Sequence, residues 1–176
     1  MTMTYQRIDK EFYQPGDIIF CHGRSLVDWG IRVAEWLRFR RGSYYNHVAM
    51  LWRYDEELGD WMIIEAESRG VTTNTLSFRL ARCTVKVYAQ PAAIRSPNDP
   101  INFMLNQQGD KYGFLTLVSL IPSLILPGMI SFYKPGTWIC SAVVAEALRY
   151  GGWLYNWTNM YQTTPAQLYE AIQNVA

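Results

Sequence analysis

Cys140 has the residue type and the setting that thiol chemistry requires in this 176-residue chain. The segment 138–152 predicts a helix with the cysteine in its first turn and a glycine stop after Tyr150. A thiol at that position lies at the positive end of the helix dipole, which lowers the pKa of the thiol and raises the fraction present as thiolate. The alternative is a small buried residue of a core helix, because free cysteine is among the most buried residue types.

A thiolate becomes an effective catalyst when a base lies beside it, and the chain has two histidines, His22 and His47. His22 directly follows Cys21, and neighbours on a strand point to opposite faces, so those two cannot pair with each other. His47 lies inside the apolar strand predicted for residues 44–52, where an imidazole is costly unless it has partners. His47 is therefore the candidate base, and a structural histidine is the alternative.

Glu65 is the candidate partner of His47. It ends the apolar strand predicted for residues 61–66, which should pair with the His47 strand as an antiparallel hairpin. A carboxylate that accepts a hydrogen bond from one imidazole nitrogen leaves the other nitrogen to face the thiol. Glu67 lies on the same strand face and is the alternative partner. The backbone N–H of Cys140 is a candidate oxyanion donor.

The elements that must position these residues predict an α+β fold with a small, mostly antiparallel sheet. Pro135–Thr137 should supply a turn and a helix N-cap, and Gly109–Tyr112 should be a loop. Further strands are expected at residues 18–21, 70–73 and 84–89. Further helices are expected from Ser25 to about Arg41, from an Asn98 or Asp99 cap to about Gln108, and from a Thr164–Gln167 capping box to about Gln173.

The composition indicates one domain over residues 1–176, since 49% of the residues are hydrophobic and 18% are charged. A net charge of +1 gives no argument for a nucleic-acid partner. Three widely spaced cysteines argue against a disulfide framework, and no metal-ligand spacing exists, so we expect no metal and no cofactor. Residues 1–14 are polar, so we expect no signal peptide and a chain that is cytoplasmic as synthesised.

Residues 113–133 carry no charge and form an apolar insertion. Their length approaches that of a membrane span, but Pro122, Pro127 and Gly128 break them into short pieces. We therefore expect a buried or lid-like segment rather than a bilayer anchor. Contact with a membrane or with a protein through this segment is the alternative.

Four segments of the sequence resemble the signature segments of the NlpC-type papain-like cysteine peptidases. They are PGDIIF (15–20), NHVAML (46–51), IIEAESRGV (63–71) and WICSAVVAEAL (138–148). The cysteine helix comes last here, whereas it comes first in the common form of that family. The order thus resembles the circularly permuted, YiiX-like branch, which is related to lecithin:retinol acyltransferase. Two further segments also look like parts of that branch, residues 109–120 and 163–172.

The resemblance implies a permuted papain-like fold with Cys140 as nucleophile, His47 as general base and Glu65 as the polar group behind the histidine. It implies hydrolysis of amide or ester bonds through a thioester, most commonly on cell-wall peptides of peptidoglycan. Two alternatives stay open. One is a lipid-directed acyltransferase or amidase, and the other is a non-catalytic component of a phage or secretion apparatus. Either the cell wall or a phage particle would then be the destination of the chain.

Overall fold

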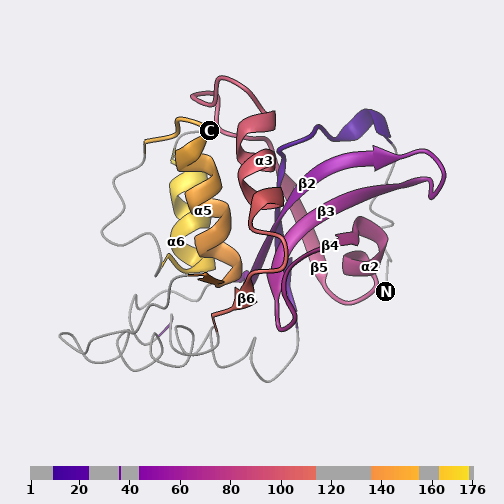
Figure 1. The fold of residues 1–176 in the computed structure, drawn as a ribbon, viewed down its shortest axis with the longest axis horizontal. Coiled ribbons are helices and arrows are strands. Elements are labelled where there is room, and N and C mark those ends of the chain that lie inside the picture. Colours follow the sequence, from indigo (N-terminus) through magenta and orange to yellow (C-terminus); the bar gives the residue numbers. More distant parts are fainter. Residues whose placement is uncertain (1–9, 24–35, 37–43, 114–135, 155–162, 175–176) are drawn as a thin grey trace.

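Five strands form one antiparallel sheet in the computed structural model, which describes residues 10–23, 36, 44–113, 136–154 and 163–174. The sheet order is β4-β3-β2-β1-β5 (Figure 1). The strands are β1 (Ile18–His22), β2 (His47–Asp55), β3 (Asp60–Glu67), β4 (Gly70–Thr75) and β5 (Thr84–Tyr88). The predicted α+β class and the mostly antiparallel sheet are confirmed.

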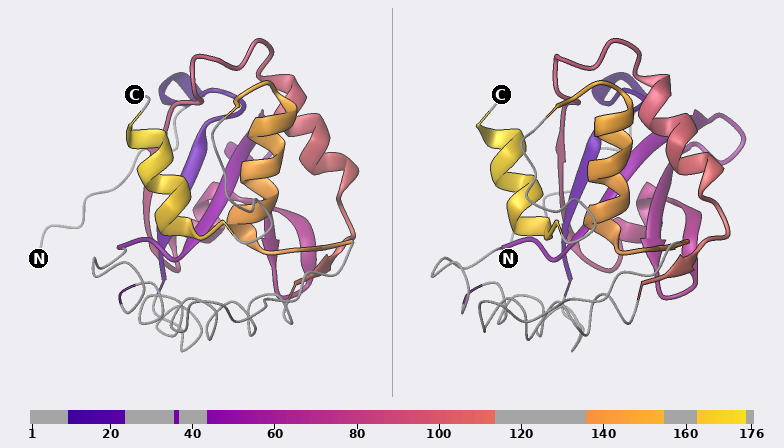
Figure 2. Two further views of the ribbon diagram at one scale, coloured as in Figure 1. Left: turned by 90° about the vertical axis from the view of Figure 1, so that its left-hand side faces the viewer. Right: turned by 60° about the vertical axis from the view of Figure 1, so that its left-hand side comes forward.

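The helices in the described part of the chain are divided between the two faces of this sheet (Figures 1 and 2). One face is covered by α3 (Asn98–Asn106), α5 (Cys140–Tyr150) and α6 (Pro165–Gln173). The other face carries the short helix α2 (Leu76–Leu80). A 3-10 turn, η1 (Lys10–Phe12), precedes β1.

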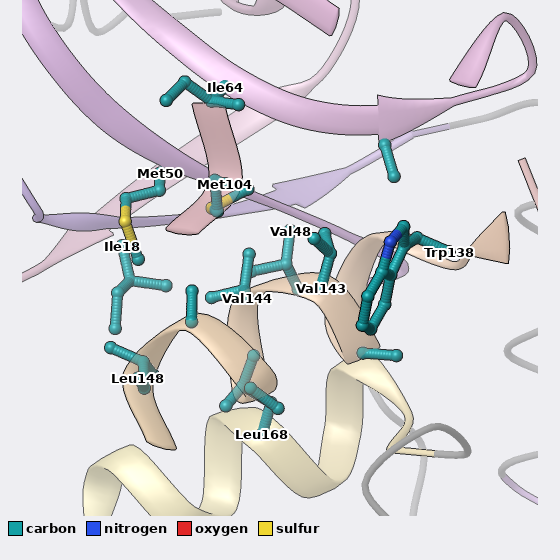
Figure 3. Packing of buried hydrophobic residues seen from close by; sticks show 14 of the residues in the cluster. Ile18, Val48, Met50, Ile64, Met104, Trp138, Val143, Val144, Leu148 and Leu168 are labelled. Carbon is teal, nitrogen blue, oxygen red and sulfur yellow. The ribbon is translucent and has the colours of Figure 1, made fainter. Parts of the chain in front are cut away.

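The larger core lies between the sheet and the three helices of the first face. Figure 3 shows Val48 and Met50 of β2 on the side of the sheet that carries Val144 of α5, with Leu168 of α6 below α5. All four side chains are fully buried. Strand residues at even positions of β2 thus anchor α5, and burial of each such side chain contributes roughly 1.5–3 kcal/mol. A second buried cluster on the opposite face packs around α2.

The β2–β3 hairpin is antiparallel, as the sequence predicted. Ala49 lies opposite Glu65, and Asp55 lies opposite Asp60 across the turn. Directly opposed residues of antiparallel strands point to the same face. Ala49, and with it His47 two residues earlier, therefore shares a sheet face with Glu65. A register shift between Leu51 and Arg53 marks a bulge farther along β2.

Three local predictions were wrong. Asn98 and Asp99 do not cap α3; Pro97 occupies the N-cap without a side-chain hydrogen bond. Thr137 is not the cap of α5, because Ile139 is. Thr137 belongs instead to β7 (Thr137–Trp138), which pairs in parallel with β6 (Lys111–Tyr112) where a loop was predicted. This pairing joins residues 26 positions apart, and no local pattern indicates it.

Other predictions agree or fall outside the described residues. The α6 capping box is present, with both the Thr164 side chain and the Gln167 side chain bonded to backbone N–H groups. The predicted helix from Ser25 to Arg41 and the apolar segment 113–133 lie almost wholly outside the described residues. Among the helices that the structure describes, none has the length and hydropathy needed to cross a bilayer.

Gly70, at the start of β4, provides a test of the packing beside the hairpin. Its φ is +106°, and a Cβ there would lie 2.2 Å from the Asp110 carbonyl oxygen. We expect Gly70→Ala to lower the free energy of unfolding by several kcal/mol, because strain at positive φ and a backbone clash add together. Urea unfolding followed by circular dichroism measures the loss.

Gly109→Ala is the matched control, because Gly109 has φ +91° and nothing within 4 Å of its added Cβ. It should cost about 1–3 kcal/mol, the strain alone. Equal losses in the two variants would contradict the close approach of β4 to Asp110.

Candidate active site

The structure brings His47 and Glu65 into direct contact. His47 is the first residue of β2, and Glu65 lies near the C-terminal end of the neighbouring strand β3. The imidazole Nε2 is 2.7 Å from Glu65 Oε2. Glu65 is completely buried, and the His47 side chain is 15% exposed. This contact leaves Nδ1 as the ring nitrogen available to another partner.

That other partner is the sulfur of Cys140, which hydrogen-bonds to the His47 ring. Cys140 is the first residue of α5, as the sequence predicted, and is buried. The backbone N–H groups of Val48 and Ser141 also donate to the sulfur. The contact joins the two faces of the sheet, because α5 packs on one face and Glu65 points to the other. It is made at the end of β2, where a ring at the first strand position can reach past the sheet.

The charges in this contact favour a thiolate and an imidazolium. Burial lowers the pKa of His47, but the Cys140 sulfur and the Glu65 carboxylate outweigh it and raise that pKa to about 10. Burial raises the pKa of Cys140, but the neighbouring His47 charge and hydrogen bonds to the sulfur bring it below its ordinary value. The proton shared by the pair therefore resides on the imidazole near neutral pH.

The second oxygen of Glu65 is bound by residues that the sequence analysis did not select. Asn74 Nδ2 in β4 donates to Oε1 at 2.6 Å. Arg79 in α2 places its Nε and Nη2 at 2.9 Å and 2.6 Å from the same oxygen. Burial alone would raise the pKa of Glu65, but His47 and Arg79 lower it to about 2. The sequence did contain one indication of such residues. A buried carboxylate has two oxygens and a single histidine binds one of them, so a further donor to Glu65 was to be expected.

The choice between Glu65 and Glu67 as the carboxylate that contacts His47 is settled by geometry. Glu67 lies on the same face but binds arginines. Its Oε1 accepts from Arg69 Nη2 at 2.6 Å, and its Oε2 accepts from Arg79 Nη2 at 3.0 Å. Arg79 thus bridges the two carboxylates.

The two other cysteines and His22 have partners of their own. Cys21 lies opposite His47 in the β1–β2 pairing and hydrogen-bonds to Cys83. That bond raises the pKa of Cys21 and lowers the pKa of Cys83. His22 instead stacks on Tyr44, with ring centroids 4.1 Å apart, and its Nδ1 contacts the Tyr44 carbonyl oxygen.

Asn46, directly before His47, holds the start of β2 in place. Its side chain accepts from the Gly23 N–H at 2.9 Å and donates to the Gly23 carbonyl at 3.0 Å. Its backbone N–H donates to the Cys21 carbonyl. These three bonds tie the residue before the imidazole to the end of β1, and so restrict where the His47 ring can point.

A family model described as the permuted papain-like amidase enzyme, YaeF/YiiX, C92 family, matches residues 12–119. This chain belongs to that family. The match covers more than half of the chain and includes His47, Glu65, Asn74 and Arg79, and it ends before Cys140. No curated protein matches its sequence. The predicted family and the permuted papain-like fold are confirmed.

The protonation state of His47 is directly testable. We expect His47 to remain protonated between pH 6 and 8.5, because its pKa is raised to about 10. In Cys140→Ser the thiolate charge is lost, so the pKa of His47 should fall toward its ordinary value of 6.5. Imidazole proton shifts in an NMR titration measure both, with His22→Gln to assign the signals.

Thr137→Ser is a control, since it leaves the charges around His47 in place. A His47 signal that titrates identically in wild type and in Cys140→Ser would contradict the ion pair.

Proposed function

We propose that this protein is a cysteine amidase in which Cys140 is the nucleophile, His47 the general acid and base, and Glu65 the group that orients the imidazole. The observation that carries the proposal is the continuous contact from the Cys140 sulfur through His47 to a buried, ionised Glu65. Membership of a papain-like amidase family supports the same reaction class.

The reaction begins with the thiolate of Cys140 attacking the carbonyl carbon of an amide. As the C–N bond breaks, the imidazolium of His47 donates its proton to the leaving amine, and a thioester remains. A water molecule then gives its proton to the neutral imidazole and attacks the thioester. The acid product leaves, and the proton on His47 restores the thiolate–imidazolium pair. Glu65 keeps Nε2 protonated throughout, so that Nδ1 faces the sulfur.

The substrate class that we propose is the peptide amide bonds of peptidoglycan. The resemblance of the four sequence segments to NlpC-type peptidases supports this class. The protein would then act at the cell wall, or from a phage particle. The uncharged segment 113–133 favours one alternative, an acyl-lipid amide as substrate.

Substitution of the nucleophile is the first test. Cys140→Ala should reduce amide hydrolysis by at least about a thousandfold, because the covalent intermediate cannot form. Cys21→Ala and Cys83→Ala should retain turnover. The assay compares release of free amines from muropeptides and from acyl-lipid amides, with each variant beside the wild type.

The substrate panel also separates the alternatives. Hydrolysis of acyl-lipid amides alone would replace the cell-wall substrate with a lipid, and turnover that survives in Cys140→Ala would overturn the nucleophile. A non-catalytic role would follow if Cys140 alkylates no faster than a free thiol.

The histidine assignment has its own test. His47→Ala should slow alkylation of Cys140 near neutral pH by about tenfold or more, because the imidazolium that stabilises the thiolate is lost. Peptide mass spectrometry after a brief iodoacetamide pulse measures Cys140 separately from Cys83, whose pKa is also lowered. His22→Ala is the matched variant, and a larger effect there would assign the base to His22.

A further inference from the structure

The candidate triad is one end of a longer chain of alternating charges that runs to the protein surface. Each member contacts the next through a hydrogen bond or an ion pair. Arg69 at the outer end is 69% exposed, whereas Arg79 in the middle is 13% exposed. In order from the surface, this ion-pair chain consists of Arg69, Glu67, Arg79, Glu65, His47 and Cys140.

Within this ion-pair chain, the Arg79 side chain contacts both carboxylates. Its Nε and Nη2 both bind Glu65 Oε1, and Nη2 also reaches Glu67 Oε2 at 3.0 Å. Planar guanidinium N–H groups fix the direction of a carboxylate as well as its charge. With Oε1 held in this way, Oε2 of Glu65 is directed at His47 Nε2.

We propose that Arg79 is a positioning residue for the amidase reaction, acting on Cys140 through Glu65 and His47. The inference deepens the proposed function and rests on it. Arg79 acts on Glu65, which it keeps ionised and aimed at the imidazole. Asn74, which donates to the same Oε1, supports the aim without adding charge.

The placement of α2 supports this role. Thr75 caps the helix by accepting the Phe78 N–H, and Leu76 is fully buried in the second cluster. The helix has only five residues, yet it presents Arg79 to the buried face of β3, directly over Glu65. Arg82, three residues later, points elsewhere: it donates to the Phe78 carbonyl and lies over the Phe78 ring.

The direction of the pH effect follows from the groups around Glu65. Those facing it are His47 from β2, Arg79 from α2 and Glu67 beside it, with Cys21 and Cys83 nearby. Removing Arg79 raises the pKa of Glu65 and frees its carboxylate to turn from His47. The imidazolium then loses its partner, which makes the thiolate–imidazolium pair less favourable, so the pH at which Cys140 begins to alkylate should rise.

The test measures the rate of Cys140 alkylation by iodoacetamide from pH 4 to 9, resolved by peptide mass spectrometry. The acid limb of this profile is the range in which the rate falls because Cys140 becomes protonated. In Arg79→Met this limb should move up by about one pH unit, so that alkylation at pH values below it is about tenfold slower than in the wild type. Arg79→Lys should reverse at least half of that shift, because lysine restores the positive charge but not the planar set of guanidinium N–H donors. Arg82→Met removes the same charge from a residue that is not part of the ion-pair chain, and it should leave the pH profile unchanged.

A double-mutant cycle shows whether the effect passes through Glu65. In the Glu65→Gln background, Arg79→Met should change the alkylation rate by less than about twofold, because its partner charge is gone. A full tenfold effect in that background would overturn the inference, as would an Arg79→Met profile that matches Arg82→Met. If Arg79→Met alone leaves Glu65 unpaired and does not fold, the role of Arg79 is decided by two other variants. These are Arg79→Lys and the double variant Glu65→Gln/Arg79→Met, which leaves no carboxylate at position 65.

Failure of the proposed function gives a different result. It would appear in the wild type itself, as a Cys140 that alkylates with the pH dependence of a free thiol. A reactive wild-type Cys140 with an Arg79→Met profile like that of wild type would remove the role of Arg79 and leave the amidase proposal in place.

Discussion

The buried carboxylate of Glu65 is the constraint on which the site depends. It has no exposure to solvent, and its pKa of about 2 means that it carries a full charge. An unpaired charge at such a position costs several kcal/mol, so both oxygens require donors. The donors come from β2, β4 and α2, through His47, Asn74 and Arg79. A single carboxylate thus fixes the relative positions of three elements around β3.

The contact between Cys140 and His47 gives stability no large pH dependence near neutral pH. The raised pKa of His47 gives stability that is complete below pH 6.5 and is lost as the pH rises toward 10. The lowered pKa of Cys140 gives stability that grows as the pH rises toward 9. Between these values the folded and unfolded pairs each hold one proton, so the two contributions oppose each other. The acid side differs, because the stability that Glu65 contributes above pH 4.5 is lost as the pH falls toward 2.

The sequence predicted those parts of the site that have a local pattern. Runs of apolar and aromatic residues located the β2–β3 hairpin, and the glycine stop located the helix that begins at Cys140. Arg79 and α2 were missed because five residues are too few to show helical periodicity. Asn74 was missed because an amide in a short strand has no distinctive spacing. The β6–β7 pairing was missed because it depends on contacts distant in the sequence.

The site combines two parts that different forces hold in place. His47, Glu65, Asn74 and Arg79 all lie within residues 47–79, on the α2 side of the sheet, and charge pairing holds them. Cys140 arrives about 60 residues later on α5, which is held by the burial of Val143 and Val144 against the opposite face. The protonation of the imidazole is therefore set on one face, and the position of the sulfur on the other. Because His47 is the first residue of β2, its ring contacts both the Glu65 carboxylate and the Cys140 sulfur. The hydrogen bonds between Asn46 and Gly23 fix His47 at the end of the strand.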